Sequence, residues 1–263
     1  MEPVYTPVVG AAAAFFKIMG WDIRVRGSDH IPREGPVVIA TNHVGYLDFA
    51  FVGYGAREQG RLVRFMAKKE IFDHPVAGPL MRGMKHISVD RFGRPDAAVR
   101  AAGHALEEGQ VVGMFPESTI SRSFVPAAGK TGAARMAMNA GALLVPGAVW
   151  GSQRILTKGR PRNFQRKVAV SVDFAAPIPY EPDDDAGEVT KRLMARIGEL
   201  VEQAAADYPQ QPAGEDDRWW LPAHLGGTAP SVAEAEEIAV KERIERRARR
   251  QAERAEERKP DAE

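Results

Sequence analysis

The sequence contains no cysteine among its 263 residues. This absence excludes disulfide bonds, thiolate nucleophiles, and zinc or iron–sulfur sites built on cysteine. An excess of charge of one sign is also missing, because 36 basic and 35 acidic residues give a formal net charge of +1. No global field therefore favours nucleic acid. Any catalysis must use His, Asp, Glu, Ser, Lys or Arg side chains.

Long hydrophobic runs are absent as well. The apolar segment 5–21 is interrupted by Lys17 and falls short of the roughly 20 residues that a membrane-spanning helix needs. The first residues, MEPVYTP, lack the basic region of a secretory signal. The segment suits a short helix that lies at a membrane surface or packs on its own domain. Its large apolar residues are Phe15, Phe16, Ile18, Met19 and Trp21, with Lys17 and Arg24 nearby.

Short runs rich in Val and Ile alternate with helix-like segments along the chain. The runs are 36–40, 61–67, 86–90, 111–115, 142–150 and 168–174, and the helical segments are 48–58, 75–82, 95–108 and 130–139. Such runs are typical of strands buried on both faces. The alternation predicts a single α/β domain with a mostly parallel central sheet flanked by helices, whose functional groups collect at the carboxyl ends of the strands.

We expect three parts in the chain. Residues 1–22 are predicted to be an N-terminal membrane-surface helix, residues 23–208 the α/β domain, and residues 209–263 a linker and a charged helical tail. A stripe of apolar residues from Leu193 to Tyr208 predicts a helix packed on the domain. The tail carries charges of both signs and few large apolar residues, so it indicates a solvated helix, with weak attraction to anionic lipid as the alternative.

The segment TNHVGYLDF follows a predicted strand and places His43 five residues before Asp48. On one helix these side chains would point about 140° apart, so a turn is needed for them to meet, and Gly45 supplies backbone freedom for it. Asp48 could then accept a hydrogen bond from one ring nitrogen of His43 and raise the basicity of the other. The alternative is a histidine that caps the next helix, with Asp48 as an ordinary N-terminal charge.

A second group of polar residues follows the predicted strand 111–115. In FPESTISRSF, Glu117 is followed by hydroxyls that include Ser118 and Thr119, and by the cation Arg122. This group could hold an anionic part of a substrate, or it could be an ordinary hydroxyl-rich loop.

Together these segments resemble the glycerolipid acyltransferases, specifically the bacterial 1-acylglycerol-3-phosphate (lysophosphatidate) acyltransferases. Asn42, His43 and Asp48 match the first motif, NH, four residues, then D. The stretch from Ala67 to Arg91, which includes Lys69, is similar to the second region. FPESTIS is similar to the third motif, FPEGTRS, and LLVPGAV to the fourth. The four blocks occur in the family's order between residues 36 and 150.

Two residues depart from the third motif. Ser118 stands where the family usually has Gly, and Ile120 stands where it usually has a phosphate-binding Arg. Arg122 is the natural substitute for that arginine. The other candidate phosphate ligands are Arg91 and Lys130, either of which could instead be a surface charge.

The resemblance implies an O-acyltransferase that moves a fatty acyl group from a thioester of coenzyme A or acyl carrier protein to the free hydroxyl of lysophosphatidate. It implies His43 as general base oriented by Asp48, and Glu117, Ser118, Thr119, Arg122, Arg91, Lys130 and Lys69 as substrate-binding residues. No cofactor, metal or nucleic acid is expected. We expect a peripheral protein at the cytoplasmic face of the plasma membrane.

Several alternatives remain open. The acceptor could be another lysophospholipid, glycerol 3-phosphate or a glycolipid, and more distantly the protein could be a membrane-surface binding module without activity. The stretch AAGKTGAAR suggests a nucleotide-binding loop, but Phe124 stands where that loop requires its first glycine. A metal site would have too few ligands at His43 with Asp48 or at His86 with Asp90. We expect His74 and His86 to be structural.

Overall fold

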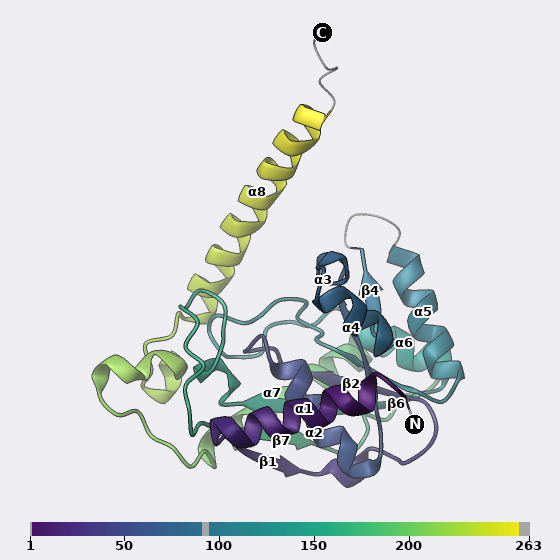
Figure 1. Cartoon of the computed structure of the whole chain (residues 1–263), viewed down its shortest axis with the longest axis horizontal. Helices are drawn as coiled ribbons and strands as arrows, with labels where there is room; N and C mark the ends of the chain where they lie inside the picture. The colour runs from purple at the N-terminus through teal and green to yellow at the C-terminus, as the bar shows by residue number, and fades with distance from the viewer. Residues whose placement is uncertain (1, 91–94, 258–263) are drawn as a thin grey trace. The chain divides into compact units, whose positions relative to one another are not determined.

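The computed structural model describes residues 2–90 and 95–257 (Figure 1). The chain divides into two compact units. The first comprises Met1–Ser121 and Pro126–Pro212, and the second comprises Arg122–Val125 and Ala213–Glu263. The first unit contains the sheet and the predicted catalytic pair.

A single sheet of seven strands, in the order β1-β7-β6-β2-β5-β3-β4, forms the centre of the first unit. Its neighbours are parallel except β6 and β7, which are antiparallel. The mostly parallel sheet predicted from the sequence is therefore confirmed. The strands are β1 Asp22–Arg26, β2 Val37–Thr41, β3 Val63–Lys68, β4 Ile87–Val89, β5 Val111–Met114, β6 Leu143–Trp150 and β7 Ala169–Phe174.

The burial of each strand explains which ones the sequence revealed. Every residue of β2 and of β7 is buried, so both are rich in Val, Ile and Ala, although β7 also contains the buried polar residues Ser171 and Asp173. The strand β1 was not predicted, because its residues DIRVR alternate between exposed and half-buried positions at an edge of the sheet.

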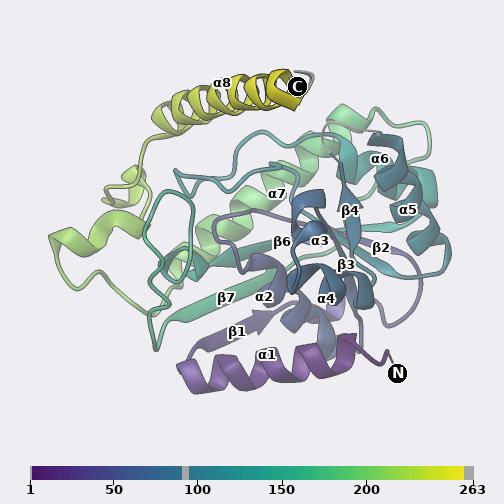
Figure 2. The same ribbon diagram turned by 45° about the horizontal axis from the view of Figure 1, so that its top comes forward.

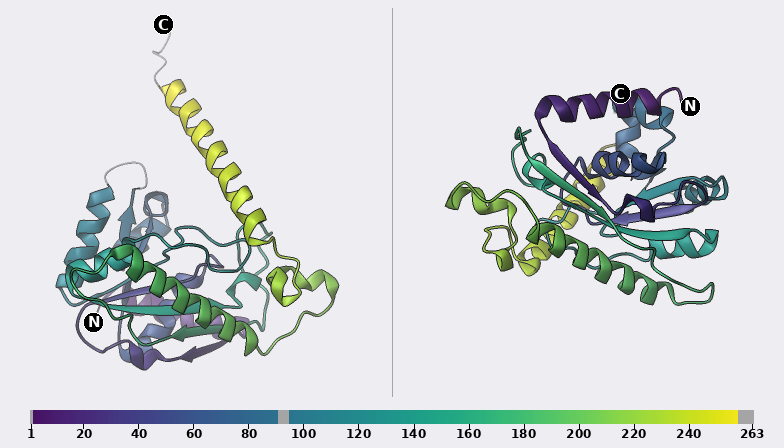
Figure 3. Two further views of the ribbon diagram at one scale, coloured as in Figure 1. Left: turned by 180° about the vertical axis from the view of Figure 1, so that it is seen from behind. Right: turned by 90° about the horizontal axis from the view of Figure 1, so that it is seen from below.

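Helices cover both faces of the sheet. On one face, α5 Pro95–Glu107, α6 Gly132–Ala140 and α7 Ala186–Ala206 contact the strands. On the other face lie α1 Tyr5–Met19 and α2 Asp48–Ala56. The right panel of Figure 3 shows the sheet between α1 and α7. The stripe predicted on α7 packs inward, since Leu193, Ile197 and Val201 are buried.

The helix α1 has two different faces. Phe16 and the following Trp21 are buried in the core, whereas Phe15 is 42% and Ile18 65% exposed. Phe16 and Trp21 therefore pack on the domain and are not accessible to lipid, and contact of the exposed side chains with a membrane stays a prediction. Figure 2 shows α1 as a layer outside β1 and α2. In the described part of the chain, no helix combines the length and apolarity needed to cross a membrane.

The short elements complete the first unit. They are α3 Lys69–Asp73, α4 Ala77–Gly83, and the 3-10 turns Ser28–His30, Arg57–Gln59 and Ser152–Arg154. His74 accepts backbone hydrogen bonds from Val76 and Ala77 at the start of α4. His86 accepts one from the backbone of Phe65 at 3.0 Å, so both histidines have structural contacts, as expected.

The second unit consists mainly of short turns and one long helix. The turns are Glu215–Trp220 and Ala223–Leu225, and the helix is α8 Val232–Glu257. Trp220 is 1% exposed. The predicted charged helix is therefore present in α8.

The strand order determines which loops meet. Because β6, β2, β5 and β3 are parallel, their carboxyl ends share one edge of the sheet. The strand β2 lies between β5 and β6. The segment that follows β2, which contains His43, therefore has the segments after β5 and β6 as its neighbours.

Candidate active site

Asn42 anchors the turn that follows β2. Its side-chain amide donates to the carbonyl of Val149 at 3.0 Å and accepts from the Val149 N–H at 2.7 Å. These two bonds continue the pairing of β2 with β6 one residue beyond the strand. Asn42 is fully buried, so its role is to hold the next residue, His43, at a fixed height above the sheet.

His43 and Asp48 are in direct contact. The Nδ1 atom of His43 lies 2.9 Å from Oδ2 of Asp48, as the sequence predicted. Because a carboxylate oxygen can only accept, Nδ1 carries the proton and Nε2, on the other side of the ring, is left as the basic atom. No side-chain capping bond forms at the start of α2, so the alternative of a helix-capping histidine is not observed.

Further donors hold the Asp48 carboxylate. Its Oδ2 atom accepts from the N–H groups of Val44 at 2.7 Å and Gly45 at 2.8 Å. Its Oδ1 atom accepts from the hydroxyl of Ser152 at 2.5 Å. Asp48 is completely buried and begins α2, where a carboxylate is favourable. The carboxylate is therefore fixed in position on both oxygens.

The reason for glycine at position 45 differs from the predicted one. Gly45 is not among the residues with a positive φ, so backbone freedom is not what the position requires. A Cβ atom there would lie 2.8 Å from Oγ of Ser152 and 3.2 Å from Oδ1 of Asp48. The glycine is needed because the Ser152 segment approaches the backbone closely.

The ring of His43 stacks on Phe115 with 4.0 Å between centroids and an interplanar angle of 11°. The stacking fixes the plane of the imidazole. The side chain of His43 retains 18% exposure, although its aspartate partner has none. A small polar group of a substrate can therefore reach the ring.

Glu117 joins two segments of the site. Its Oε1 atom accepts from the N–H of His43 at 2.9 Å, and Oε2 accepts from the N–H of Ala127 at 3.0 Å. Burial raises the pKa of the Glu117 carboxyl from 4.5 to about 7, against the effect of these two N–H donors, and the charge of Asp48 adds to the rise. We expected Glu117 to hydrogen-bond the acceptor or the neighbouring loop; the structure shows the bond to the loop at Ala127, and a contact with the acceptor stays a prediction.

The loop after Glu117 explains the glycine of the family motif. Ser118 has φ 58°, a left-handed conformation that glycine adopts without steric cost. Thr119 is exposed, and Ile120 is 7% exposed. The buried isoleucine occupies the position where the third motif usually has an arginine.

The predicted phosphate-binding cations are more exposed than Asp48 or pair with other side chains. Lys69 is 53% exposed and pairs with Asp73 at 2.6 Å. Lys130 is exposed, and its backbone N–H donates to the carbonyl of Pro116 at 3.0 Å, next to Glu117. In the second unit, Arg122 forms an ion pair with Glu242 of α8. Arg91 lies outside the described residues.

Ser152 is the site residue that the sequence analysis missed. It is 1% exposed and follows β6, in WGSQR, beyond the fourth motif. The signal available was its position: a hydroxyl just after a buried strand that ends at the same edge as β2. Using that signal would have required the strand order.

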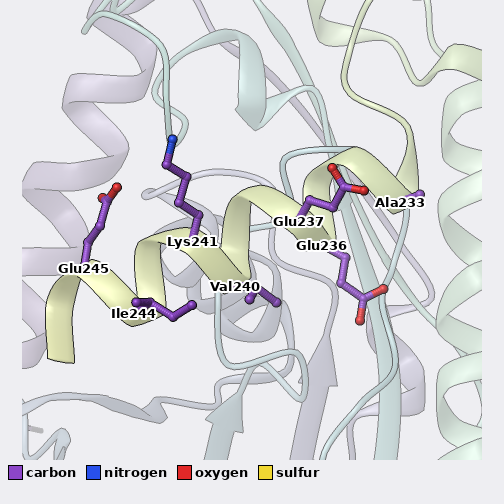
Figure 4. Close-up of a pocket in the computed structure, with 7 residues that line it drawn as sticks. All are labelled: Ala233, Glu236, Glu237, Val240, Lys241, Ile244 and Glu245. Atoms are coloured by element: carbon purple, nitrogen blue, oxygen red, sulfur yellow. The ribbon is translucent and has the colours of Figure 1, made fainter. Parts of the chain in front are cut away.

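A hollow of about 740 Å³ lies along α8 in the second unit (Figure 4). Its described lining residues all belong to that helix, and Val240 and Ile244 project from the same side of it. They are Ala233, Glu236, Glu237, Val240, Lys241, Ile244 and Glu245.

Comparisons with known proteins show similarity to acyltransferases. The acyltransferase family model matches residues 22–150. A 1-acyl-sn-glycerol-3-phosphate acyltransferase of Bacillus subtilis is 29% identical over 181 residues, which cover 68% of this chain and 87% of that protein. An enzyme of the same name from Limnanthes douglasii is 29% identical over 179 residues, covering 66% of this chain and 60% of that protein.

A solved structure shares the fold. The crystal structure of the 1-acyl-sn-glycerophosphate (LPA) acyltransferase PlsC from Thermotoga maritima superimposes with a TM-score of 0.64 at 21% identity, covering 79% of this chain and 82% of that chain. This likeness shows the fold alone, whereas the family model and the relatives from Bacillus and Limnanthes indicate an enzyme that transfers acyl groups. Over residues 22–150 the chain is therefore similar to the acyltransferase family, and its fold is that of PlsC.

Proposed function

We propose that the protein is a 1-acylglycerol-3-phosphate O-acyltransferase of phospholipid biosynthesis. It transfers a fatty acyl group from an acyl thioester to the free hydroxyl of lysophosphatidate. The observation that carries this proposal is the contact of His43 Nδ1 with Asp48 at 2.9 Å, which leaves Nε2 free to act as a base on a ring that keeps 18% exposure. The names of the relatives from Bacillus and Limnanthes support the choice of acceptor.

The mechanism needs no covalent enzyme intermediate. Nε2 of His43 removes the proton of the acceptor hydroxyl while the hydroxyl oxygen attacks the thioester carbonyl. A carbon–oxygen bond forms, the carbon–sulfur bond breaks, and the proton on Nε2 passes to the departing thiolate. Asp48 stabilises the imidazolium that exists between these two proton transfers. The products are the ester and a free thiol.

The donor we propose is acyl-coenzyme A or acyl-acyl carrier protein, as a co-substrate and without a further cofactor. Lys130, Arg122, Lys69 and Arg91 are the candidate ligands of the acceptor's phosphate, with the hydroxyls of Ser118 and Thr119 beside them. A lysine acts on a phosphate as a point charge, whereas an arginine can bind it through two hydrogen bonds.

A different acceptor is the second candidate. Two observations favour it: Ile120 is buried in place of the usual arginine, and Arg122 is paired with Glu242. Both weaken the expected phosphate site. The acceptor would then be another lysophospholipid, glycerol 3-phosphate or a glycolipid, with the same chemistry at His43.

One experiment separates these candidates. The purified protein is incubated with one long-chain acyl-coenzyme A and, in turn, lysophosphatidate, glycerol 3-phosphate, lysophospholipids and a glycolipid, and the products are identified by mass. We expect phosphatidate and stoichiometric free thiol, and a loss of about 10³-fold or more in the His43→Ala variant. Substantial turnover by that variant would remove His43 from the mechanism, and a preference for another acceptor would select the second candidate.

Membrane contact is part of the proposal, because both the acceptor and the product are lipids. The exposed Phe15 and Ile18 of α1, with Lys17 between them, support a peripheral location at the cytoplasmic face of the plasma membrane. Flotation with anionic liposomes tests it: a Phe15→Ser, Ile18→Ser variant should float less than the parent protein. Equal flotation of both proteins would contradict a role for α1.

A further inference from the structure

The turn that carries His43 and Asp48 rests on a segment far away in the sequence. The hydroxyl of Thr157 donates to the carbonyl of Val44 at 2.6 Å, and the N–H of Tyr46 donates to the carbonyl of Leu156 at 2.9 Å. Ser152 adds the bond to Oδ1 of Asp48. Of these contacts, only the one from Ser152 reaches a side chain, the carboxylate that holds His43, rather than the backbone.

The two oxygens of Asp48 are held by different parts of the fold. Oδ2 accepts from His43 and from the N–H groups of Val44 and Gly45, all within the turn itself. Oδ1 accepts from Ser152, which is 104 residues away in the chain. The Ser152 bond therefore ties the carboxylate to the sheet, whereas the other three tie it only to its own turn.

Ser152 is itself held rigidly. The preceding Gly151 has φ 93°, and a Cβ atom at that glycine would lie 2.2 Å from the carbonyl oxygen of Ala169. The carbonyl of Ser152 accepts from the N–H groups of Ile155 at 3.0 Å and Leu156 at 3.3 Å. Being 1% exposed, the serine has no room to move away from Asp48.

The orientation of the His43 ring has two components. Stacking on Phe115 fixes the ring plane but permits rotation within that plane. The bond from Nδ1 to Asp48 fixes this rotation and with it the direction in which Nε2 points. Proton transfer requires a hydrogen bond of defined length and direction. If the Asp48 carboxylate can move, the His43 ring can rotate in its plane and Nε2 no longer points in one direction.

We propose that Ser152 is a positioning residue for acyl transfer: its hydroxyl fixes the Asp48 carboxylate and, through it, the in-plane orientation of His43. Ser152 itself touches no reacting atom. The inference rests on the proposed role of His43 as the base.

The test compares Ser152→Ala with a matched control, Thr190→Val. The control removes another buried hydroxyl, one that donates to the carbonyl of Ala186 within α7 at 2.7 Å, away from the site. We expect Ser152→Ala to lower kcat by about 10- to 100-fold, as for the loss of a hydrogen bond to a charged group, with KM for both substrates within about twofold. Thr190→Val should leave kcat within about twofold.

A second measurement does not depend on activity. In protein labelled with nitrogen-15 at histidine, the Nδ1–H signal of His43 is assigned by its loss in His43→Ala. Ser152→Ala should shift this signal and speed the exchange of its proton with water, while thermal unfolding shows that the variant is folded. Thr190→Val should leave the signal in place.

The outcomes are distinguishable. An unchanged His43 signal, or an equal loss of kcat in Ser152→Ala and Thr190→Val, would overturn the positioning role. If the signal shifts but His43→Ala retains turnover, Ser152 positions the pair and the proposed base is wrong.

Discussion

The residues proposed for the chemistry and those proposed to bind phosphate, here called the two halves, are held differently. In the half that carries the proposed chemistry, Asp48 is fully buried and accepts hydrogen bonds from four residues. In the half proposed to bind phosphate, Lys69 is half-exposed, Lys130 is exposed, and Arg122 pairs with Glu242. Proton transfer depends on positions within a fraction of an ångström, whereas attraction of an anion tolerates mobile cations. Hydrogen bonds therefore hold the residues proposed for proton transfer, which need exact positions, more firmly than the residues proposed to attract the phosphate.

The largest expected effect concerns Glu117, in the ordered half. Its folded-state pKa of about 7 exceeds its ordinary value of 4.5. Between these values the folded protein binds more protons than the unfolded chain, so its stability falls as pH rises through this window, by at most about 1.4 kcal/mol for each pH unit. Glu117→Gln should lack this component. Urea unfolding of both proteins at pH 5, 6 and 7 measures it, and identical slopes would show that Glu117 is not protonated in the folded state.

The next effect concerns the proposed phosphate ligands. Lys130→Ala and Arg122→Ala should each raise KM for lysophosphatidate about tenfold, because each removes one charged contact with phosphate, and both should leave kcat nearly unchanged. Glu242→Gln should lower KM, since it releases Arg122 from its ion pair. Initial rates at saturating acyl-coenzyme A give these values. A fall in kcat without a change in KM would mean that the substituted cation acts in the chemical step and not in binding the acceptor. The two halves would then not differ in function.

The smallest effect concerns the boundary between the halves. Ser118→Gly should raise the free energy of unfolding by about 0.5–1 kcal/mol, because glycine removes the steric cost of φ 58° but adds entropy to the unfolded chain. Ser118→Ala, which keeps the steric cost, is the control. Denaturant unfolding compares the three proteins. A glycine variant no more stable than the parent would mean that contacts of the serine side chain offset the strain.

Most of the sheet could be predicted because burial gives β2, β5, β6 and β7 short sequences that are mostly apolar and rich in Val. The edge strand β1 could not, since exposure allows its alternate residues to be charged. The contact between His43 and Asp48 could be predicted because both lie in one short motif. The roles of Gly45 and Ser152 could not, because both depend on the approach of a segment more than a hundred residues away, through a strand order that local patterns do not contain.

The separation of 104 residues between Asp48 and Ser152 also has a consequence for biosynthesis. A nascent chain that has emerged only as far as Trp150 already displays every block of the family signature. It still lacks the serine and the threonine that brace the turn. The bonds from Ser152 and Thr157 can form only after those residues have left the ribosomal exit tunnel, so the turn lacks them until translation has passed beyond the recognisable motifs.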